Sequence, residues 1–177
     1  VNASYLHICR MTFANLYVAH KNLVYNLALQ YTQNVQDAEE VSQDVFVSVH
    51  GKLGTFKQAS DIKTWLYRIT INKSLDFLKA QKRKKRWGFI NAQRIDDRDA
   101  GIDVVNFDHP GAQLEQKEAL ETIFTCINQL SENQKTVIIL LKIEQMSQTE
   151  AAVVMELSTK AVESLFQRAK KNLATLL

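Results

Sequence analysis

The sequence predicts an all-α fold built from two small helical modules. Only one proline and five glycines occur among 177 residues, whereas turn-rich β folds need many more of both. Apolar residues make up 46% of the chain, which is enough for packed cores. Along most of the chain they recur at the three- and four-residue spacing of amphipathic helices. The length suits one ordinary domain or two small ones.

The first module is expected over residues 11–85, after an N-terminal extension of residues 1–10 in which Met11 is a candidate natural start. Three helices are predicted in it. The first has apolar residues at helical spacing between Phe13 and Tyr31, and the second between Val35 and Val49. Asp37 and Glu40 form a possible capping box for the second helix, although its start could equally lie two residues earlier. After a polar loop, the third helix is predicted from Ile62 to about Lys82.

A linker is predicted over residues 86–112, in a stretch where no apolar period is kept. Lys79–Arg86 holds six basic residues and no acid, and Asp96–Asp108 holds five aspartates. Residues 86–112 also contain scattered apolar side chains. Two alternatives for them stay open: they bind a partner from a flexible linker, or they pack back on the modules.

The second module is expected over residues 113–177, with four helices. The first has apolar residues at helical spacing from Leu114 to Leu130. Ser131 and Gln134 form a predicted capping box that opens the next helix, residues 132–144. Ser147 and Glu150 form another, which opens a short helix that ends near residue 156.

The last helix, capped by Ser158, completes a pair with helix-turn-helix dimensions over Ser147–Leu173. Its polar residues can read base edges through Gln and Arg and hold phosphates through Lys. The alternative is a solvated amphipathic helix that only caps the bundle. The predicted outward residues are Thr159, Lys160, Glu163, Ser164, Gln167, Arg168, Lys170 and Lys171.

Two further surfaces are candidates for binding. Aromatic and basic residues alternate over Phe56–Lys82, which suits stacking on unpaired bases, although Trp65 at helical spacing also fits a core position. The predicted second helix carries Asp37, Glu39, Glu40, Gln43 and Asp44, which are either solvated or dock on a basic partner.

Catalysis, cofactors and metals are not expected. The four histidines and two cysteines lack metal-ligand spacing, and no nucleophile motif or glycine-rich phosphate loop is present. The longest uncharged apolar stretch, Thr136–Leu141, is far too short to span a membrane. We therefore expect a cytoplasmic protein that is not an enzyme.

Three segments together resemble the extracytoplasmic-function sigma factors of the bacterial sigma-70 family. They are Asp37–Phe46 (DAEEVSQDVF), the stretch from Phe56 through Thr64–Ile69 (TWLYRI), and Ala161–Leu173 (AVESLFQRAKKNL). The resemblance implies a region 2 bundle of three or four helices and a region 4 helix-turn-helix bundle, joined by a flexible linker. It also implies an alternative sigma factor that binds core RNA polymerase, recognises promoter DNA and initiates transcription.

The resemblance further implies partners and roles for residues. The partners would be promoter DNA, the clamp helices of the largest polymerase subunit, the flap of the second largest, and an anti-sigma factor; the free chain would be a monomer. For polymerase binding the implied residues are Asp37, Glu40, Gln43 and Asp44. For the minus-ten element they are Phe56, Lys57, Ser60, Asp61, Lys63, Asn72 and Lys73. For the minus-thirty-five element they are Thr159, Lys160, Glu163, Ser164, Gln167, Arg168 and Lys171.

The sequence departs from the family pattern at a few positions. Glu163 stands where many members carry a basic residue, and Gln145 where glycine is frequent. Glu150-Ala151-Ala152 takes the place of the usual Glu-Ile-Ala triplet. Two other functions are compatible with the helices alone: a dimeric helix-turn-helix repressor, and an adaptor that uses the helices only for protein contacts.

Overall fold

The computed structural model describes residues 12–56, 61–92 and 114–177, and this part of the chain contains helices and no strands. The expected all-α fold is confirmed. None of the described helices is long and apolar enough to cross a membrane. The elements are α2 (Phe13–Thr32), α3 (Val35–Lys52), the 3₁₀ turn η1 (Leu53–Thr55), α4 (Ile62–Ala92), α5 (Leu114–Gln129), α6 (Glu132–Ile138), the π-helical turn η2 (Ile139–Ile143), α7 (Gln148–Met155) and α8 (Thr159–Ala174).

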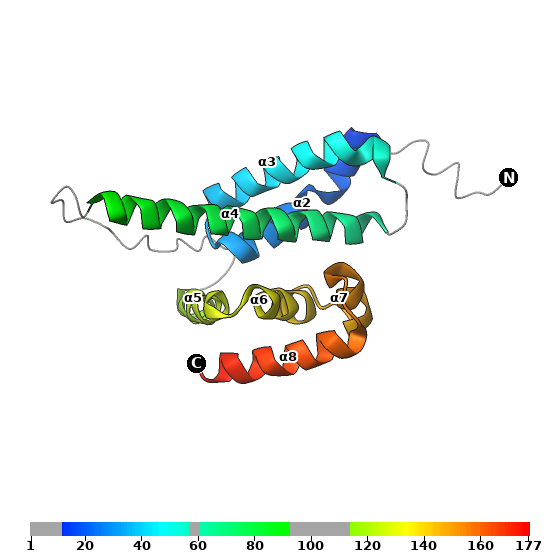
Figure 1. Cartoon of the computed structure of the whole chain (residues 1–177). Coiled ribbons are helices and arrows are strands. Elements are labelled where there is room, and N and C mark those ends of the chain that lie inside the picture. Colours follow the sequence, from blue (N-terminus) through cyan, green and yellow to red (C-terminus); the bar gives the residue numbers. More distant parts are fainter. Residues whose placement is uncertain (1–11, 57–60, 93–113) are drawn as a thin grey trace.

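The helices form two layers, each corresponding to one module (Figure 1). In the first module, α2, α3 and α4 pack around a core to which all three contribute, including Val24, Val45 and Leu66. In the second module, α5 to α8 lie against one another beneath this bundle, and α8 forms the outer edge. Its buried side chains Val162 and Ala169 face inward.

The connection between α2 and α3 places the cap of α3 at Asn34 rather than at Asp37, the predicted cap. Gln33 ends α2 in the left-handed region (φ 59°), and its backbone N–H donates to the Leu29 carbonyl. Asn34 then caps α3 by accepting a hydrogen bond from the Asp37 backbone N–H at 3.0 Å. The helix thus starts two residues before Asp37, which is the earlier of the two predicted starts, and Asp37 is not its cap.

Helix α4 is longer than the apolar pattern indicates, because it continues through the basic run to Ala92 rather than ending near Lys82. Lys, Arg, Gln and Ala all favour helices, so the run propagates the helix without needing a core to pack against. Residues 82–87 are exposed. In Figure 1 this end of α4 projects beyond the rest of the first module.

The second module confirms one predicted capping box and not the other. Ser147 accepts a hydrogen bond from the Glu150 backbone N–H, and the Glu150 carboxylate accepts one from the Ser147 backbone N–H, so both halves are present. Ser131 precedes α6 but makes no side-chain capping hydrogen bond. Gln134 instead accepts from Asn172 of α8 at 3.2 Å, which ties α6 to the last helix.

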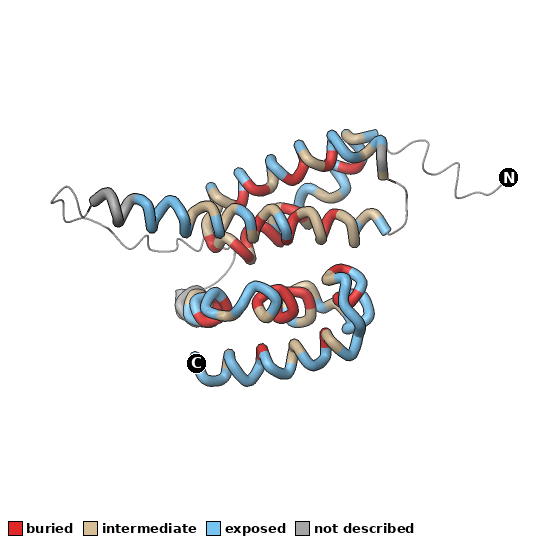
Figure 2. Tube along the Cα trace, viewed as in Figure 1, coloured by how far each residue is buried: buried red, intermediate tan, exposed pale blue. Residues whose placement is uncertain are grey.

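The two modules pack on each other through a shared apolar cluster. Side chains of the first module, Leu27, Tyr31, Tyr67 and Ile71, are buried in one cluster with side chains of α5 to α8. Figure 2 shows buried residues on the sides of the two layers that face each other, whereas the outer side of α8 is exposed. This contact joins residues far apart in the chain and was not predicted from the sequence.

Candidate nucleic-acid and polymerase interfaces

The helix-turn-helix is held at both ends by local hydrogen bonds. Ser147 caps α7 as described, and Ser158 caps α8 by accepting from the Ala161 backbone N–H at 3.2 Å. Glu156 ends α7 in the left-handed region (φ 56°), which gives the sharp turn between the helices. Leu165 and Phe166 pack against the core on the inner side of α8. These contacts fix which side of α8 faces solvent.

All seven residues predicted for the minus-thirty-five element are exposed on α8. We call them the reading face: Thr159, Lys160, Glu163, Ser164, Gln167, Arg168 and Lys171. Within it, Arg168 Nε donates back to the Ser164 carbonyl at 3.4 Å, so its guanidinium lies along the helix surface. Glu163 is three residues from Lys160 and four from Gln167, so the one acid of this face lies next to a basic and an amide side chain.

The residues predicted for the minus-ten element fall into two groups. Phe56 follows η1, and Asp61 and Lys63 lie at the start of α4, where Asp61 Oδ2 accepts from the Lys63 backbone N–H at 3.1 Å. The ring centroid of Phe56 lies 4.7 Å from that of Trp65, with the two rings tilted by 36°. Trp65 is half-buried against the core of the first module. Nearby, burial and the charge of Lys63 lower the pKa of His20 on α2. Lys57 and Ser60 lie outside the described residues.

Asn72 and Lys73 form the second group, further along α4. Nine residues separate Lys63 from Asn72, which is two and a half helical turns, so the two side chains leave α4 on opposite sides. Asn72 is exposed and lines a cleft of about 180 Å³ between the modules, together with Arg68, Asn133 and Glu156. Lys73 lies 3.9 Å from Asp44 of α3. The minus-ten residues therefore do not share one face of α4.

The four residues predicted for polymerase binding all lie on α3, but they differ in exposure. Glu40 and Gln43 are exposed, and Asp44 is exposed beside Lys73. Asp37 is half-buried and accepts a hydrogen bond from Gln81 Nε2 at 2.8 Å. Glu40, Gln43 and Asp44 are thus available to a partner, whereas Asp37 joins α3 to α4.

An apolar groove of about 860 Å³ between α2 and α3 was not predicted from the sequence. Phe13, Tyr17 and Phe46 line it, with ring centroids of Tyr17 and Phe46 4.8 Å apart, and Gln43 lies at its edge. Val47 also lines it and is 72% exposed. The signal in the sequence was Val47, which interrupts the inward apolar spacing of α3.

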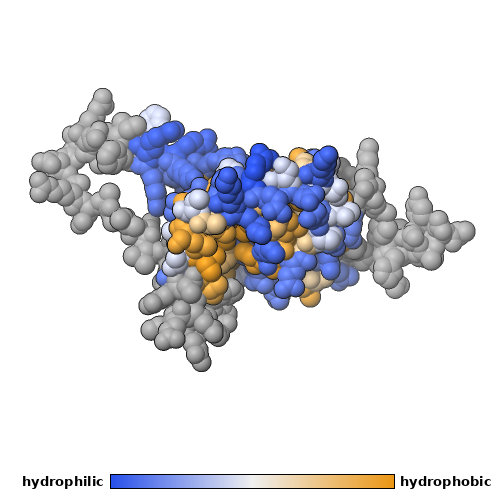
Figure 3. Space-filling model, turned by 90° about the horizontal axis from the view of Figure 1, so that it is seen from below, coloured by the Kyte–Doolittle hydropathy of each residue, from blue (hydrophilic) through white to orange (hydrophobic). Residues whose placement is uncertain are grey.

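A second apolar groove, of about 550 Å³, lies between α5, α6, η2 and α8 of the second module, and Gln30 of α2 also lines it. Its lining includes Ile123, which is 39% exposed, and Phe166 and Leu173 of α8. Figure 3, viewed from the side of this module, shows an apolar area bordered by hydrophilic side chains. Lys142 and Lys170 lie 5.4 and 5.8 Å from the Phe166 ring and place positive charge at the groove.

A buried lysine joins the modules. Lys135 of α6 donates to the Tyr31 carbonyl in the last turn of α2 at 2.9 Å and to Asn128 of α5. Its Nζ also lies 5.0 Å from the centre of the Tyr31 ring. Burial disfavours the charged form, and with repulsion from Lys82 it lowers the pKa of Lys135 to about 7. The charge of this interface therefore changes near neutral pH.

Within the described residues, no group of histidine, cysteine or acidic side chains is arranged to hold a metal ion. The exposed surfaces of the described residues are a helix-turn-helix, a basic helix with aromatic residues at its start, and two apolar grooves. Together these features define a DNA-binding protein that also docks on protein partners.

Comparisons with known proteins identify the family. The family model for sigma-70 region 2 matches residues 16–84, and that for sigma-70 region 4 matches residues 120–173. The RNA polymerase sigma factor CnrH of Cupriavidus metallidurans is 32% identical over 167 residues, covering 93% of this chain and 86% of CnrH. The ECF RNA polymerase sigma-E factor of Haemophilus influenzae is 30% identical over 158 residues, covering 89% and 83%.

Solved structures of sigma factors have the same fold as this chain. CnrH in complex with the cytosolic domain of CnrY matches with a TM-score of 0.62 and 26% identity, over 93% of this chain and 86% of that one. The sigma factor RpoE of Bartonella quintana, bound to the anti-sigma factor NepR, has the same fold, with a TM-score of 0.63 and 21% identity over 93% and 95% of the two chains. The chain belongs to the extracytoplasmic-function branch of the sigma-70 family. It is an alternative sigma factor, which directs core RNA polymerase to promoters and initiates transcription.

Proposed function

We propose that this sigma factor reads the minus-thirty-five element with α8 and the minus-ten element with α4, and that it has no enzymatic activity of its own. It would act in the cytoplasm, beside core polymerase and DNA. The observation that carries the proposal is the reading face, since all seven of its residues are exposed on one capped helix whose other side is buried. Its Gln and Arg side chains can pair with base edges, and its lysines with phosphates.

At the minus-ten element, the start of α4 and the loop before it would receive an unpaired base, and Asn72, further along α4, would make a separate contact with the opened strand. Phe56 and Trp65 provide aromatic surface there, and Lys63 provides charge. Extruding a base costs a few kcal/mol of stacking, which contacts to the base must offset. Stacking on an aromatic side chain contributes about 1–3 kcal/mol per base, which is of the required size.

Core polymerase would dock on both modules. On the first module, Glu40, Gln43 and Asp44 of α3 would contact the clamp helices beside the α2/α3 groove; Asp37 would support them through Gln81. On the second module, the groove between α5, α6 and α8 would take an apolar segment of the flap. Exposed apolar grooves bordered by polar residues are typical of protein interfaces.

An anti-sigma factor is a further proposed partner. CnrH and RpoE were solved bound to CnrY and NepR, and the chain shares its fold with both. An inhibitor that covered either apolar groove would compete with polymerase for the same surface. The free chain would be a monomer.

Run-off transcription on genomic fragments with core polymerase tests this function. We expect promoter-specific transcripts only when the chain is added. The free chain should bind the same promoter weakly, because its two DNA surfaces act at high effective concentration only when polymerase holds both. Tight, sequence-specific binding by the free protein, or a stable homodimer that binds a palindrome, would favour a repressor instead.

Variants of Arg168 test the role of the reading face. Arg168→Ala should lower transcription from promoters with a minus-thirty-five element by about tenfold, the loss expected for one base-reading arginine. Arg168→Lys is the matched control, because it keeps the charge but loses the planar fork that pairs with a base. If Arg168→Lys restored transcription fully, Arg168 would contact a phosphate rather than a base. If Arg168→Ala left transcription unchanged, Arg168 would not contact the minus-thirty-five element.

A further inference from the structure

The contact between the modules places the two DNA-binding surfaces next to each other. Arg68 of α4 pairs with Glu156, the residue that ends α7, at 2.9 Å. Helix α8 begins at Thr159, three residues after Glu156, and three residues span at most about 11 Å. Arg68 and Asn72 are one turn apart and line the same cleft between the modules. The start of the reading helix therefore lies close to the minus-ten surface of α4.

This closed arrangement cannot engage both promoter elements at once. The minus-ten and minus-thirty-five elements are about 25 base pairs apart, which is roughly 85 Å along straight duplex at 3.4 Å per base pair. Surfaces that touch in the closed chain must therefore separate on a promoter. The contacts that hold them together oppose DNA binding by the free chain.

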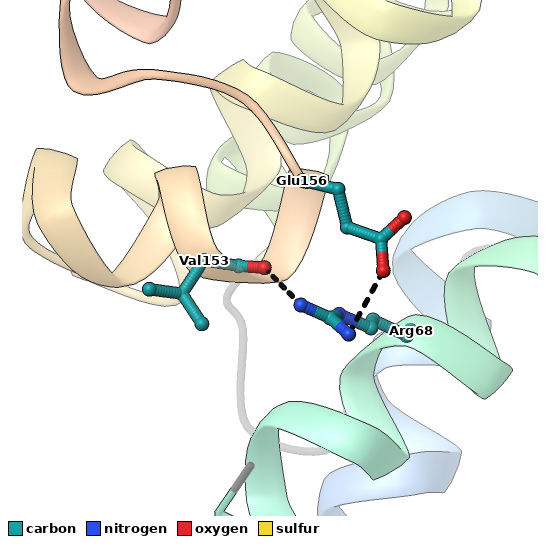
Figure 4. A network of polar contacts seen from close by, with 3 residues as sticks. All are labelled: Arg68, Val153 and Glu156. Carbon is teal, nitrogen blue, oxygen red and sulfur yellow. Dashed lines mark hydrogen bonds and ion pairs between the residues drawn. The ribbon is translucent and has the colours of Figure 1, made fainter. Parts of the chain in front are cut away.

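The main polar contact resembles a helix cap supplied by the other module (Figure 4). One Nη of Arg68 pairs with the Glu156 carboxylate, and the other donates to the Val153 carbonyl in the last turn of α7. A cation at a helix C-terminus is favourable, because the last carbonyls lack partners and carry partial negative charge. Lys135 makes the corresponding contact in the opposite direction: it belongs to the second module and donates to the Tyr31 carbonyl near the end of α2 of the first module.

We propose that Arg68 is a latch residue that holds the chain closed through Glu156 and the end of α7, and that it exchanges these partners for a DNA phosphate when polymerase separates the modules. This inference rests on the proposed function and adds a regulatory step to it. Three features of Arg68 favour the exchange. It lies one turn from Asn72, one of its present partners is a carboxylate, which is anionic like a phosphate, and its buried Nε has no partner among the described residues. A guanidinium can bind a phosphate through two parallel hydrogen bonds.

Glu156→Gln is the informative variant, because it removes the anion of the latch and leaves Arg68 in place. Glutamine keeps an unbranched side chain at a left-handed position, whereas glycine would also relieve backbone strain there. Glu121→Gln is the matched control, since it makes the same charge change on α5 of the same module. Binding is measured by fluorescence polarisation with a labelled non-template oligonucleotide that spans the minus-ten element of a promoter mapped by run-off transcription.

We expect Glu156→Gln to bind this oligonucleotide about two- to five-fold more tightly than wild type when free, the range expected for loss of a partly exposed ion pair. Glu121→Gln should bind like wild type. With core polymerase bound, the gain of Glu156→Gln should vanish, because the modules are already apart. Small-angle scattering of the free variant should show a larger radius of gyration than wild type. Equal gains in both variants, or no gain in Glu156→Gln, would overturn the latch.

Arg68→Ala separates the two roles of the arginine. It should also loosen the free chain, but with core polymerase it should bind the oligonucleotide more weakly than wild type, and Arg68→Lys should recover part of that loss. Wild-type binding by Arg68→Ala on polymerase would refute the exchange to phosphate. If the proposed function were wrong, wild type would yield no promoter-specific transcript, which differs from the results that would refute the latch. Normal transcripts with no effect of Glu156→Gln would reject only the latch.

Discussion

The contact between the modules predicts a measurable coupling between Tyr31 and Thr136. The Tyr31 hydroxyl of α2 donates to Thr136 Oγ1 of α6 at 2.8 Å, and both residues are buried. Burial raises the pKa of the Tyr31 hydroxyl, so it stays a proton donor at neutral pH. Tyr31→Phe removes the donor and Thr136→Val the acceptor, while the packing around them is nearly kept. Tyr31→Phe also leaves the carbonyl and ring that contact Lys135.

A buried hydrogen bond between neutral groups contributes about 1 kcal/mol net, and leaving one partner buried without the other costs about 1–3 kcal/mol. Each single variant should therefore lower the free energy of unfolding by about 1–2 kcal/mol. The double variant should cost about 1 kcal/mol less than the sum of the two, because the second change removes an already orphaned group.

Urea unfolding of wild type, the two single variants and the double variant, all as full chains, completes this double-mutant cycle. The coupling energy should lie clearly above the 0.3–0.5 kcal/mol within which distant sites add. Additive effects within that limit would mean that α2 and α6 are not in contact in the free chain. In that case the closed arrangement, and with it the latch, would be wrong.

Three further predictions concern local features. The stability of the closed chain should rise with pH between about 7 and 10.5, by up to about 1.4 kcal/mol per pH unit, because Lys135 is neutral when buried in this window but protonated when exposed; urea unfolding against pH checks this, and a profile unchanged by Lys135→Met would contradict it. Ser147→Ala should lower stability by about 1 kcal/mol, and the melting temperature by about 2–4 °C, through loss of the α7 cap. Thermal unfolding that matched wild type would rule out the capping box as a source of stability. Gln145→Gly should raise stability by about 0.5–1 kcal/mol, because glycine tolerates the left-handed backbone there (φ 55°); a lower melting temperature would show that the Gln145 side chain matters more than its backbone.

Much of the fold follows from apolar spacing and caps that are visible in the sequence. The cap at Ser147 and the inward side of α8 are examples, since each depends only on neighbouring residues. The start of α3 was ambiguous because Asn34 and Asp37 are both good caps, and local sequence does not decide between them. The end of α4 was misplaced because a solvated helix has no apolar period to detect, although Lys and Arg favour helices.

The site was harder to predict wherever it depends on contacts distant in sequence. The reading face needs one helix only, and its exposed residues follow from the helical repeat. The pairing of Arg68 with Glu156 joins residues far apart in the chain, and nothing local distinguishes Arg68 from a solvated arginine. The α2/α3 groove was missed for the same reason, because Tyr17 looks like a core residue until both helices are in place.

The length of α4 also limits how far apart the two promoter elements can be. From Asn72 to Ala92, α4 measures about 30 Å at 1.5 Å per residue. Residues 93–113 add at most about 70–75 Å, even if every residue were fully stretched. A helical basic run advances less than half as far per residue as an extended chain would. Together the two segments reach at most about 100 Å, which exceeds the roughly 85 Å between the two elements. The chain thus works as a tether of fixed maximum length that permits this spacing and would exclude only much longer spacers.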